Sequence, residues 1–206
     1  MAIELPQVTL VSVSSIQIEE TIMALIKSSE EINFHDCILL SDELPDNLPE
    51  KISFHKINKL TNVNEYSRFC LFELTKYIKT EYALIIQYDG YVLRPSKWQD
   101  TFLNYDYIGT PWPSGLFDGS HLRVGNGGFS LRSKKLLDSM TVLNLPFTDN
   151  GTGHYSEDLQ ICVFHRTALE NSGIKFAPPK LAAEFSHELE VPEHCNQPFG
   201  FHRYII

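Results

Sequence analysis

A short apolar run that ends abruptly at polar residues, at positions 83–92, constrains the fold more than any other stretch of this chain. It reads Ala-Leu-Ile-Ile-Gln-Tyr-Asp-Gly-Tyr-Val, and its branched side chains and short length favour a buried strand over a buried helix. Ligands bind α/β proteins just beyond the carboxyl ends of such strands, so Asp89 stands where a charge is useful. Gly90 lets the backbone turn there. The alternative is a turn with no binding role, because Asp-Gly pairs are common in ordinary loops.

Strand and helix signals alternate along the first half of the chain. Apolar runs predict strands over residues 8–13, 37–40, 52–57 and 83–86. Apolar residues at helical spacing predict one helix that starts at a capping-box pattern of Ser14 and Gln17, and another from about Asn64 to Lys79. The alternation predicts an α/β fold with an open, mostly parallel sheet flanked by helices, in a single Rossmann-like domain over residues 1–206.

Composition and charge argue against several classes of function. The chain has 206 residues, of which 43% are hydrophobic and 21% charged, so it can form a full core. The net charge of -9 argues against nucleic-acid binding, and no polybasic run for an anionic membrane is present. Residues 1–6 do not resemble a secretory signal, and no apolar run reaches the ~20 residues of a membrane span.

The cysteines indicate a reducing compartment. Their spacing is not that of a zinc or redox motif, and their apolar neighbours predict buried thiols at Cys37, Cys70, Cys162 and Cys195. Disulfides are the weaker alternative. We therefore expect a cytoplasmic protein, either free or peripheral to a membrane; the oligomeric state stays open.

Six short motifs follow one another in a fixed order. They are Tyr-Ser-Arg-Phe-Cys at 66–70, Gln-Tyr-Asp-Gly at 87–90, Tyr-Ile-Gly-Thr-Pro-Trp at 107–112, Gly-Asn-Gly-Gly-Phe-Ser at 125–130, Glu-Asp at 157–158 and Pro-Phe-Gly-Phe-His at 198–202. The ordered set resembles a family of short GT-A-fold glycosyltransferases long catalogued as a domain of unknown function, over nearly the whole chain. The resemblance implies a GT-A-like fold, a nucleotide-sugar donor such as a UDP-linked one, a glycan acceptor, a role in polysaccharide biosynthesis, and a divalent cation, Mn²⁺ or Mg²⁺.

The resemblance places the cation at Asp89, which matches the last acidic position of the GT-A metal motif. Gln87 departs from that motif, where another acid is usual, and a neutral amide can bond a hydroxyl but supplies no charge. One carboxylate is compatible with a hard ion when phosphates and water complete its shell. The resemblance also implies a histidine near the carboxyl terminus, best matched by His202 and next by His187. A histidine with a structural role is an equal alternative for both.

The acidic pair at 157–158 matches the general base of inverting GT-A enzymes. A base must lie near the anomeric carbon, on the face opposite the departing phosphate. Asp158 is the expected base and Glu157 the substitute. Acidic residues also favour helix N-termini for capping and dipole reasons alone, so a structural role is the alternative.

Other predicted contacts rest on position in the chain. Gly127 and Gly128 let a donor sugar approach the main chain, beside the amide of Asn126, although a tight turn would explain the same residues. Further donor contacts are predicted at strand ends, on the helix after residue 64 and in the Asp-Gly turn, at Ser12, Ser14, Asp42, Arg68 and Tyr88. Trp112 is a candidate platform for the acceptor ring, with plain packing as the alternative.

Two other functions remain open. A non-catalytic module that binds a nucleotide sugar or a glycan is conceivable because Gln87 replaces an acid. A dinucleotide-dependent oxidoreductase is disfavoured, because Ser-Val-Ser-Ser at 12–15 stands where a Gly-x-Gly-x-x-Gly motif would follow the first strand.

Overall fold

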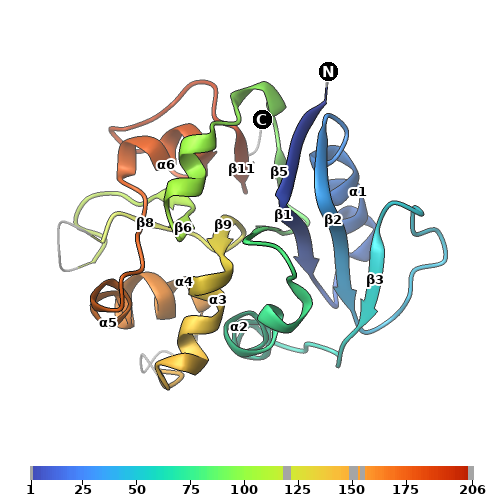
Figure 1. Cartoon of the computed structure of the whole chain (residues 1–206), viewed down its shortest axis with the longest axis horizontal. Helices are drawn as coiled ribbons and strands as arrows, with labels where there is room; N and C mark the ends of the chain where they lie inside the picture. The colour runs from blue at the N-terminus through green and yellow to red at the C-terminus, as the bar shows by residue number, and fades with distance from the viewer. Residues whose placement is uncertain (1, 118–121, 149–152, 154–155, 204–206) are drawn as a thin grey trace.

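The structure is a computed structural model that describes residues 2–117, 122–148, 153 and 156–203. A six-stranded sheet forms the centre of the molecule (Figure 1). The strands lie in the order β3-β2-β1-β4-β9-β6. Their bounds are β1 Ile3–Val13, β2 Ile32–Ser41, β3 Ser53–Lys56, β4 Tyr82–Ile86, β6 Tyr107–Ile108 and β9 Phe129–Ser133. Strands β3, β2, β1 and β4 are parallel to one another, whereas β9 runs antiparallel to β4 and β6. The predicted α/β fold with a mostly parallel sheet is confirmed.

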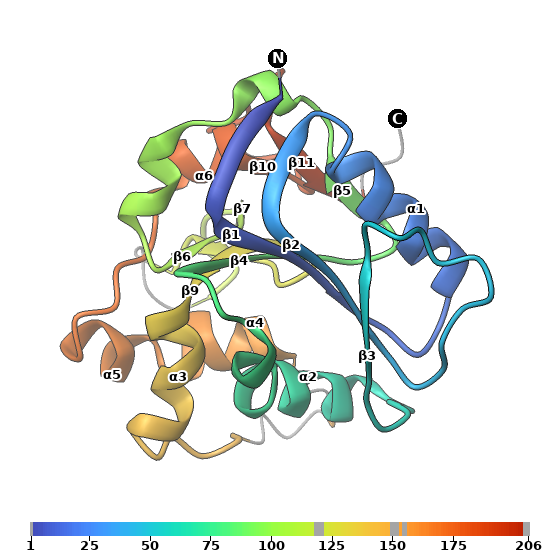
Figure 2. The ribbon, with the colours of Figure 1, turned by 45° about the vertical axis from the view of Figure 1, so that its right-hand side comes forward.

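Both faces of the sheet are covered. Alternate residues of one strand, such as Leu84 and Ile85 of β4, belong to two different apolar clusters. The first cluster includes residues of α1 (Ile18–Ser28), and the second includes residues of α2 (Val63–Phe72), η1 (Leu74–Tyr77) and α3 (Lys134–Val142). Figure 2 shows α1 on one side of the strands and α2 and α3 on the other. Burial on both faces explains why the strands appear in the sequence as continuous apolar runs.

The predicted helix boundaries need correction. Gln17 adopts a left-handed conformation with φ 48° and makes no side-chain cap, so α1 begins at Ile18 without a capping box. Ser14 Oγ instead donates to Ile16 O within a turn. The helix predicted as far as Lys79 changes after Phe72 into the 3₁₀ turn η1, where Lys134 Nζ donates to Thr75 O.

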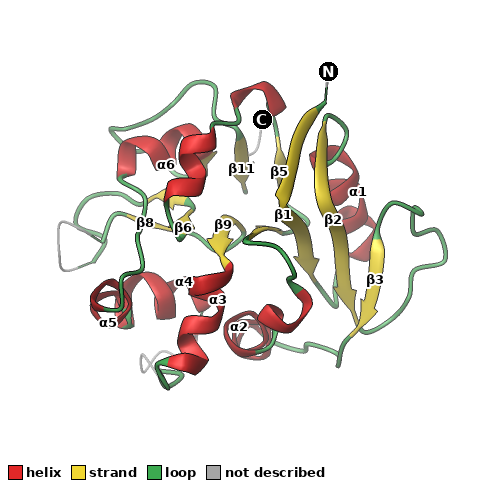
Figure 3. Cartoon of the chain, in the orientation of Figure 1, coloured by secondary structure: helices red, strands yellow, loops and turns green. Residues whose placement is uncertain are grey.

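The second half of the chain adds short elements around the sheet (Figure 3). The predicted helix at Glu157 is α4 (Glu157–Leu159), and it continues as the π-helical turn η4 (Gln160–Phe164) and then α5 (Arg166–Asn171). The remaining elements are η2 Pro95–Lys97, η3 Asp100–Asn104, β7 Thr110–Pro111, β8 Val124–Gly125 and α6 Pro179–Phe185.

A three-stranded sheet brings the carboxyl-terminal segment to the end of β4. It consists of β10 (Ser186–His187), β11 (Gly200–His202) and β5 (Gly90–Val92), with β5 antiparallel to β11. In this pairing His202 lies opposite Gly90, and the Arg203 amide donates to Asp89 O at 2.9 Å. Phe199 packs on Phe129 of β9, with 6.0 Å between the ring centroids, which joins the small sheet to the large one.

The prediction of buried thiols is confirmed for Cys37, Cys70 and Cys162 but not for Cys195. All four cysteines are free; three are buried and Cys195 is half-buried. Burial raises the pKa of Cys37 and of Cys70 to about 12. No helix within the described part of the chain has both the length and the apolar character that a membrane span requires.

Candidate functional site

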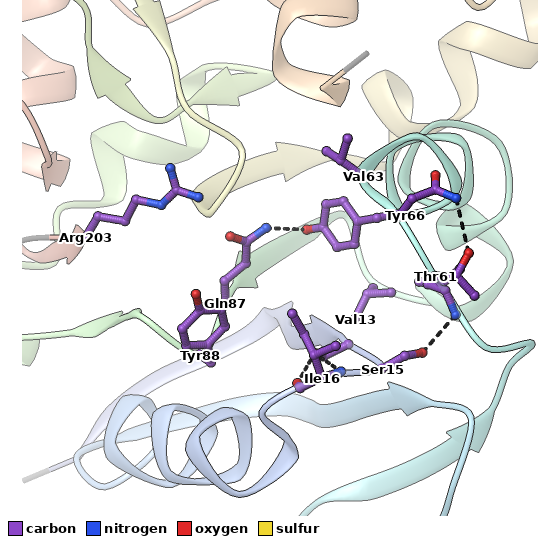
Figure 4. Close-up of a pocket in the computed structure, with 12 residues that line it drawn as sticks. Val13, Ser15, Ile16, Thr61, Val63, Tyr66, Gln87, Tyr88 and Arg203 are labelled. Atoms are coloured by element: carbon purple, nitrogen blue, oxygen red, sulfur yellow. Dashed lines mark hydrogen bonds between the residues drawn. The ribbon is translucent and has the colours of Figure 1, made fainter. Parts of the chain in front are cut away.

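A cleft at the carboxyl ends of β1 and β4 consists of two adjoining cavities of about 290 and 400 Å³. Both are lined by Val63, Tyr66, Gln87 and Arg203, which form their common wall. The smaller cavity extends over the loop after β1 and the start of α2, and Figure 4 shows Gln87 bonded to Tyr66 at its edge. The larger cavity continues towards Trp112, Gly128, Asp158, Glu188 and His202. This is the sheet edge at which ligands bind in open α/β folds.

Asp89 and His202 meet beside this cleft because β5 pairs with β11; His202 lines the larger cavity, whereas Asp89 lines neither. Asp89 Oδ1 lies 3.2 Å from His202 Nε2, and Asp89 Oδ2 lies 3.4 Å from Arg203 Nε. Oδ1 is buried but accepts no well-directed hydrogen bond. The better-directed partner of His202 Nε2 is Gln87 Oε1, at 3.1 Å. A buried carboxylate oxygen without a hydrogen bond is a position that a bound cation would satisfy.

His202 also contacts Glu188, a residue that the sequence reasoning did not single out. His202 Nδ1 lies 3.1 Å from Glu188 Oε1, and the other Glu188 oxygen accepts a short hydrogen bond from Asn126 Nδ2. The ring requires Gly128, since a Cβ on that residue would lie 2.1 Å from His202 Nε2. Asn126 has φ 63°, and its side chain accepts from the Gly128 amide at 2.9 Å. One network therefore joins the glycine segment to Asp89.

These contacts shift two pKa values. Burial alone would lower the pKa of His202, but the close polar contacts with Asp89 and Glu188, together with their charges, outweigh it and raise the pKa to about 9. Burial alone would raise the pKa of Asp89, but His202 and Arg203 outweigh it and hold the pKa below its usual range. Without a cation, the ring is therefore charged at neutral pH and donates from both nitrogens.

A buried ion pair supports the floor of the larger cavity. Arg132, whose side chain is fully buried on β9, donates from Nη2 to Glu157 Oε1 at 2.9 Å and from Nε to Ser130 Oγ at 3.1 Å. Gly127 leaves room for this pair, because its Cβ would lie 1.7 Å from Glu157 Oε1. Burial raises the pKa of Glu157 against the opposing charge of Arg132. The pair occupies one oxygen of Glu157, which favours Asp158 over Glu157 as a base.

Asp158 lies at the start of α4 and lines the larger cavity. It is half-buried, and its Oδ1 accepts from the Leu159 amide at 2.8 Å; none of the described residues donates a hydrogen bond to Oδ2. Trp112 lines the same cavity, but the residue is 5% exposed and its ring packs on Phe117 with 4.8 Å between ring centroids. A Cβ on Gly125 would lie 1.8 Å from the Trp112 ring. The indole thus presents only an edge to the cleft.

Other predicted contacts divide between the cleft and places remote from it. Ser14 and Tyr88 line the smaller cavity, as predicted for donor contacts. Ser12 is fully buried and its hydroxyl donates to Ile86 O at 2.8 Å, so it links β1 to β4 and does not reach the cleft. Asp42 lines neither cavity. Arg68 points to the opposite side of α2, where its guanidinium stacks on Phe147 at 4.2 Å.

His187, the alternative to His202, does not line the cleft; its ring lies 4.9 Å from that of His194. The residues that sequence reasoning missed are Glu188, Arg132 and Arg203, and Tyr66 was named only as part of the motif at 66–70. An arginine at the end of an apolar strand was the one usable signal, because a buried charge needs a partner. The sequence does not show that this partner is Glu157, because the two residues are far apart along the chain.

The side chains fit a divalent cation of the hard type. Asp89 offers an unbonded carboxylate oxygen, and His202 and Gln87 place a nitrogen and an amide oxygen beside it. Phosphate oxygens and water would complete the shell, as Mg²⁺ and Mn²⁺ accept. In that state the ion replaces the proton on His202, since a ligating nitrogen must be neutral.

A family described as "Protein of unknown function (DUF5672)" matches residues 50–202. The chain belongs to this family. The matched region of this DUF5672 protein includes every residue of the Asp89–His202–Glu188 network and Asp158, whereas β1, α1 and β2 lie before it. A comparison with curated protein sequences finds no match.

Solved glycosyltransferases share the fold of this DUF5672 protein. The apo form of GlyE from Streptococcus pneumoniae TIGR4 superposes with a TM-score of 0.53 and 12% identity, over 97% of this chain and 55% of GlyE. The chain thus spans little more than half the length of GlyE. An active-site mutant of LgtC superposes with a TM-score of 0.52 and 12% identity, over 94% of this chain and 86% of LgtC. The fold is therefore that of GT-A glycosyltransferases, as the sequence resemblance implied.

The His202 contacts make stability depend on pH when no cation is bound. The folded pKa of about 9 exceeds the ordinary value of 6.5, so the stabilisation is complete below pH 6.5 and disappears as pH rises through 9. We expect the difference in unfolding free energy between wild type and His202→Gln, measured by urea denaturation with a chelator, to fall by roughly 3 kcal/mol between pH 6 and pH 10.

The matched control is His35→Gln, which replaces an exposed imidazole on β2. A difference for His202→Gln that stays constant across this pH range would contradict the charged ring and its contacts with Asp89 and Glu188.

Proposed function

We propose that this protein is a glycosyltransferase that transfers a sugar from a nucleotide-diphosphate donor to a glycan acceptor, with inversion of configuration. The observation that carries the proposal is the cleft itself: His202, which contacts Asp89, lines a cavity that contains Asp158 and adjoins a second cavity at the β1 loop. A nucleotide at one end and an acceptor at the other would place the diphosphate beside Asp89. The shared fold with glycosyltransferases supports the same class of reaction.

The donor half of the proposal rests on the smaller cavity. Its lining combines main-chain and hydroxyl groups after β1 with Tyr88 and the amide of Gln87, which suit a nucleoside. Arg203 lines both cavities and carries an exposed guanidinium 3.4 Å from Asp89, where it can contact a diphosphate. A divalent cation at Asp89 neutralises the charge that develops on the leaving phosphate when it is bound.

The transfer half rests on Asp158. A single displacement requires a base that takes the proton of the acceptor hydroxyl while the sugar leaves, and Asp158 brings a carboxylate to the larger cavity. The ion pair of Arg132 and Glu157 fixes the turn from which Asp158 projects. The glycine segment offers main chain to the donor sugar, and Trp112, which lines the same cavity, is the candidate contact for the acceptor.

A binding module without catalysis is the second candidate. Gln87 supports it, because the amide contributes no charge and is already bonded to Tyr66 at 2.9 Å. Turnover separates the two functions. The donor is found first, by measuring which nucleotide sugars raise the melting temperature with and without Mn²⁺, since a ligand that binds only the native state stabilises it.

Asp89→Ala tests the cation site. The substitution removes the unbonded carboxylate oxygen but little apolar contact, so the fold should survive, whereas the Mn²⁺-dependent part of nucleotide binding should fall at least about tenfold because a hard ion loses its charged ligand. Calorimetric titration of the nucleotide with and without Mn²⁺ measures both quantities. Asp46→Ala, an exposed aspartate that lines neither cavity, is the control. Unchanged Mn²⁺ dependence in Asp89→Ala would remove Asp89 from the site.

Asp158→Asn tests the base. The amide preserves the shape and most hydrogen bonds but cannot take a proton, and loss of a positioned base typically costs about 10²–10⁴-fold in rate. We expect donor binding to stay normal and transfer to slow by at least about a hundredfold. Rates are measured with the donor identified above, and Asp46→Asn makes the same chemical change outside the cleft.

Two results would contradict this assignment. Transfer by Asp158→Asn at the wild-type rate would exclude Asp158 as the base. A product whose anomeric configuration, read by NMR, equals that of the donor would exclude a single displacement, even if the protein is a glycosyltransferase. No turnover by the wild type with any donor that binds would favour the binding module.

A further inference from the structure

The loop that follows β10 carries a second group of metal-binding side chains, away from the Asp89 site. His187 on β10 and two residues of the loop, Glu190 and His194, place one ligand atom each within 4.8 Å of one another. Across the described residues, this is the one group of three histidine, cysteine or acidic side chains that meets this limit. None of the three lines the cleft.

The group has one fixed and two accessible members. His187 is buried, and β10 pairs with β11 through Ser186 and His187, so its position is set by the small sheet. Glu190 and His194 are exposed, which gives an ion a path from solvent. The His187 and His194 rings stand edge to face at 82°, with 4.9 Å between centroids. His194 Nε2 lies 3.0 Å from Asn196 Oδ1, so donation to that oxygen leaves Nδ1 as the free ligand atom.

The chemistry of the donors points to a borderline metal. Two imidazole nitrogens and one carboxylate oxygen are a common set for zinc, with water in the fourth position, whereas Mg²⁺ and Ca²⁺ prefer oxygen alone. Ligand atoms around a tetrahedral zinc at about 2.0–2.1 Å lie roughly 3.3 Å apart, so a small closure of the exposed loop completes the site. We propose that His187, Glu190 and His194 bind a zinc ion.

The ion would fix one wall of the cleft. Glu188, next to His187, contacts His202 and Asn126. Glu193, next to His194, pairs with Arg123 at 2.8 Å, and Arg123 Nε donates to Trp112 O at 2.7 Å. Zinc therefore holds residues 187 and 194 together, at the two ends of a loop that reaches the cleft through Glu188.

Calorimetric titration of the metal-stripped full chain with Zn²⁺ tests the site. We expect one equivalent to bind with a rise in melting temperature, and His194→Ala to weaken binding at least about tenfold, because even a lost outer partner of a metal ligand costs 10–100-fold. Glu190→Gln is the second variant. The side chains of His194 and Glu190 are both exposed, so neither substitution disturbs the core. His35→Ala removes an exposed histidine elsewhere and serves as the control.

Asp89→Ala separates this site from the cleft. Zinc binding that persists in Asp89→Ala and His35→Ala but weakens in His194→Ala and Glu190→Gln supports the proposal. Any of three results would overturn it: no Zn²⁺ binding by the wild type, binding by His194→Ala and Glu190→Gln as tight as by the wild type, or loss of Zn²⁺ binding in Asp89→Ala. A Co²⁺-substituted sample whose visible spectrum is that of a six-coordinate ion would exclude the tetrahedral site.

Discussion

The antiparallel pairing of β5 with β11 is the constraint on which the site depends. It sets His202 opposite Gly90 and so places a residue near the carboxyl terminus 3.2 Å from Asp89, at the end of β4. The pairing is short, and it persists because Phe199 packs against aromatic rings of the main core and Gly200 leaves room for the Phe129 ring. Without that packing Asp89 would be a carboxylate in an ordinary turn with no binding role, which is the alternative that its Asp-Gly sequence allows.

Charge burial is the second feature that shapes the cleft. Arg132 and Glu157 form a pair that is almost fully removed from solvent, and breaking such a pair by removing one partner costs about 3–5 kcal/mol. A pair of this kind contributes little net stability compared with apolar packing, but it fixes orientation. Here it joins β9, which borders the glycine segment, to the start of α4, which presents Asp158. The two carboxylates at 157 and 158 therefore have different environments: Glu157 is paired with Arg132, and Asp158 lines the larger cavity.

The sequence predicts the large sheet well and the small one poorly, for a physical reason. Strands buried on both faces appear as apolar runs, so the strands that contain Leu10, Leu39 and Leu84 could be located from local pattern. The two- and three-residue strands of β10, β11 and β5 carry no such signal, since long-range pairing and aromatic packing define them. Asp89 was singled out by its place after a predicted strand, whereas its expected metal role and the choice of His202 came from a family resemblance. Whether Glu188, Ser12 and Arg68 reach the cleft depends on the direction of their side chains, which the spacing of residues in the sequence does not show.

A crystal structure of the protein with Mn²⁺ and the nucleotide sugar that stabilises it, with the ion located by anomalous scattering, tests the proposed site most directly. We expect the anomalous peak within coordination distance of Asp89 Oδ1 and His202, the nucleoside in the cavity beside Ser14 and Tyr88, and the anomeric carbon facing Asp158. A nucleotide bound elsewhere, or Mn²⁺ in the cleft without contact to Asp89, would contradict it.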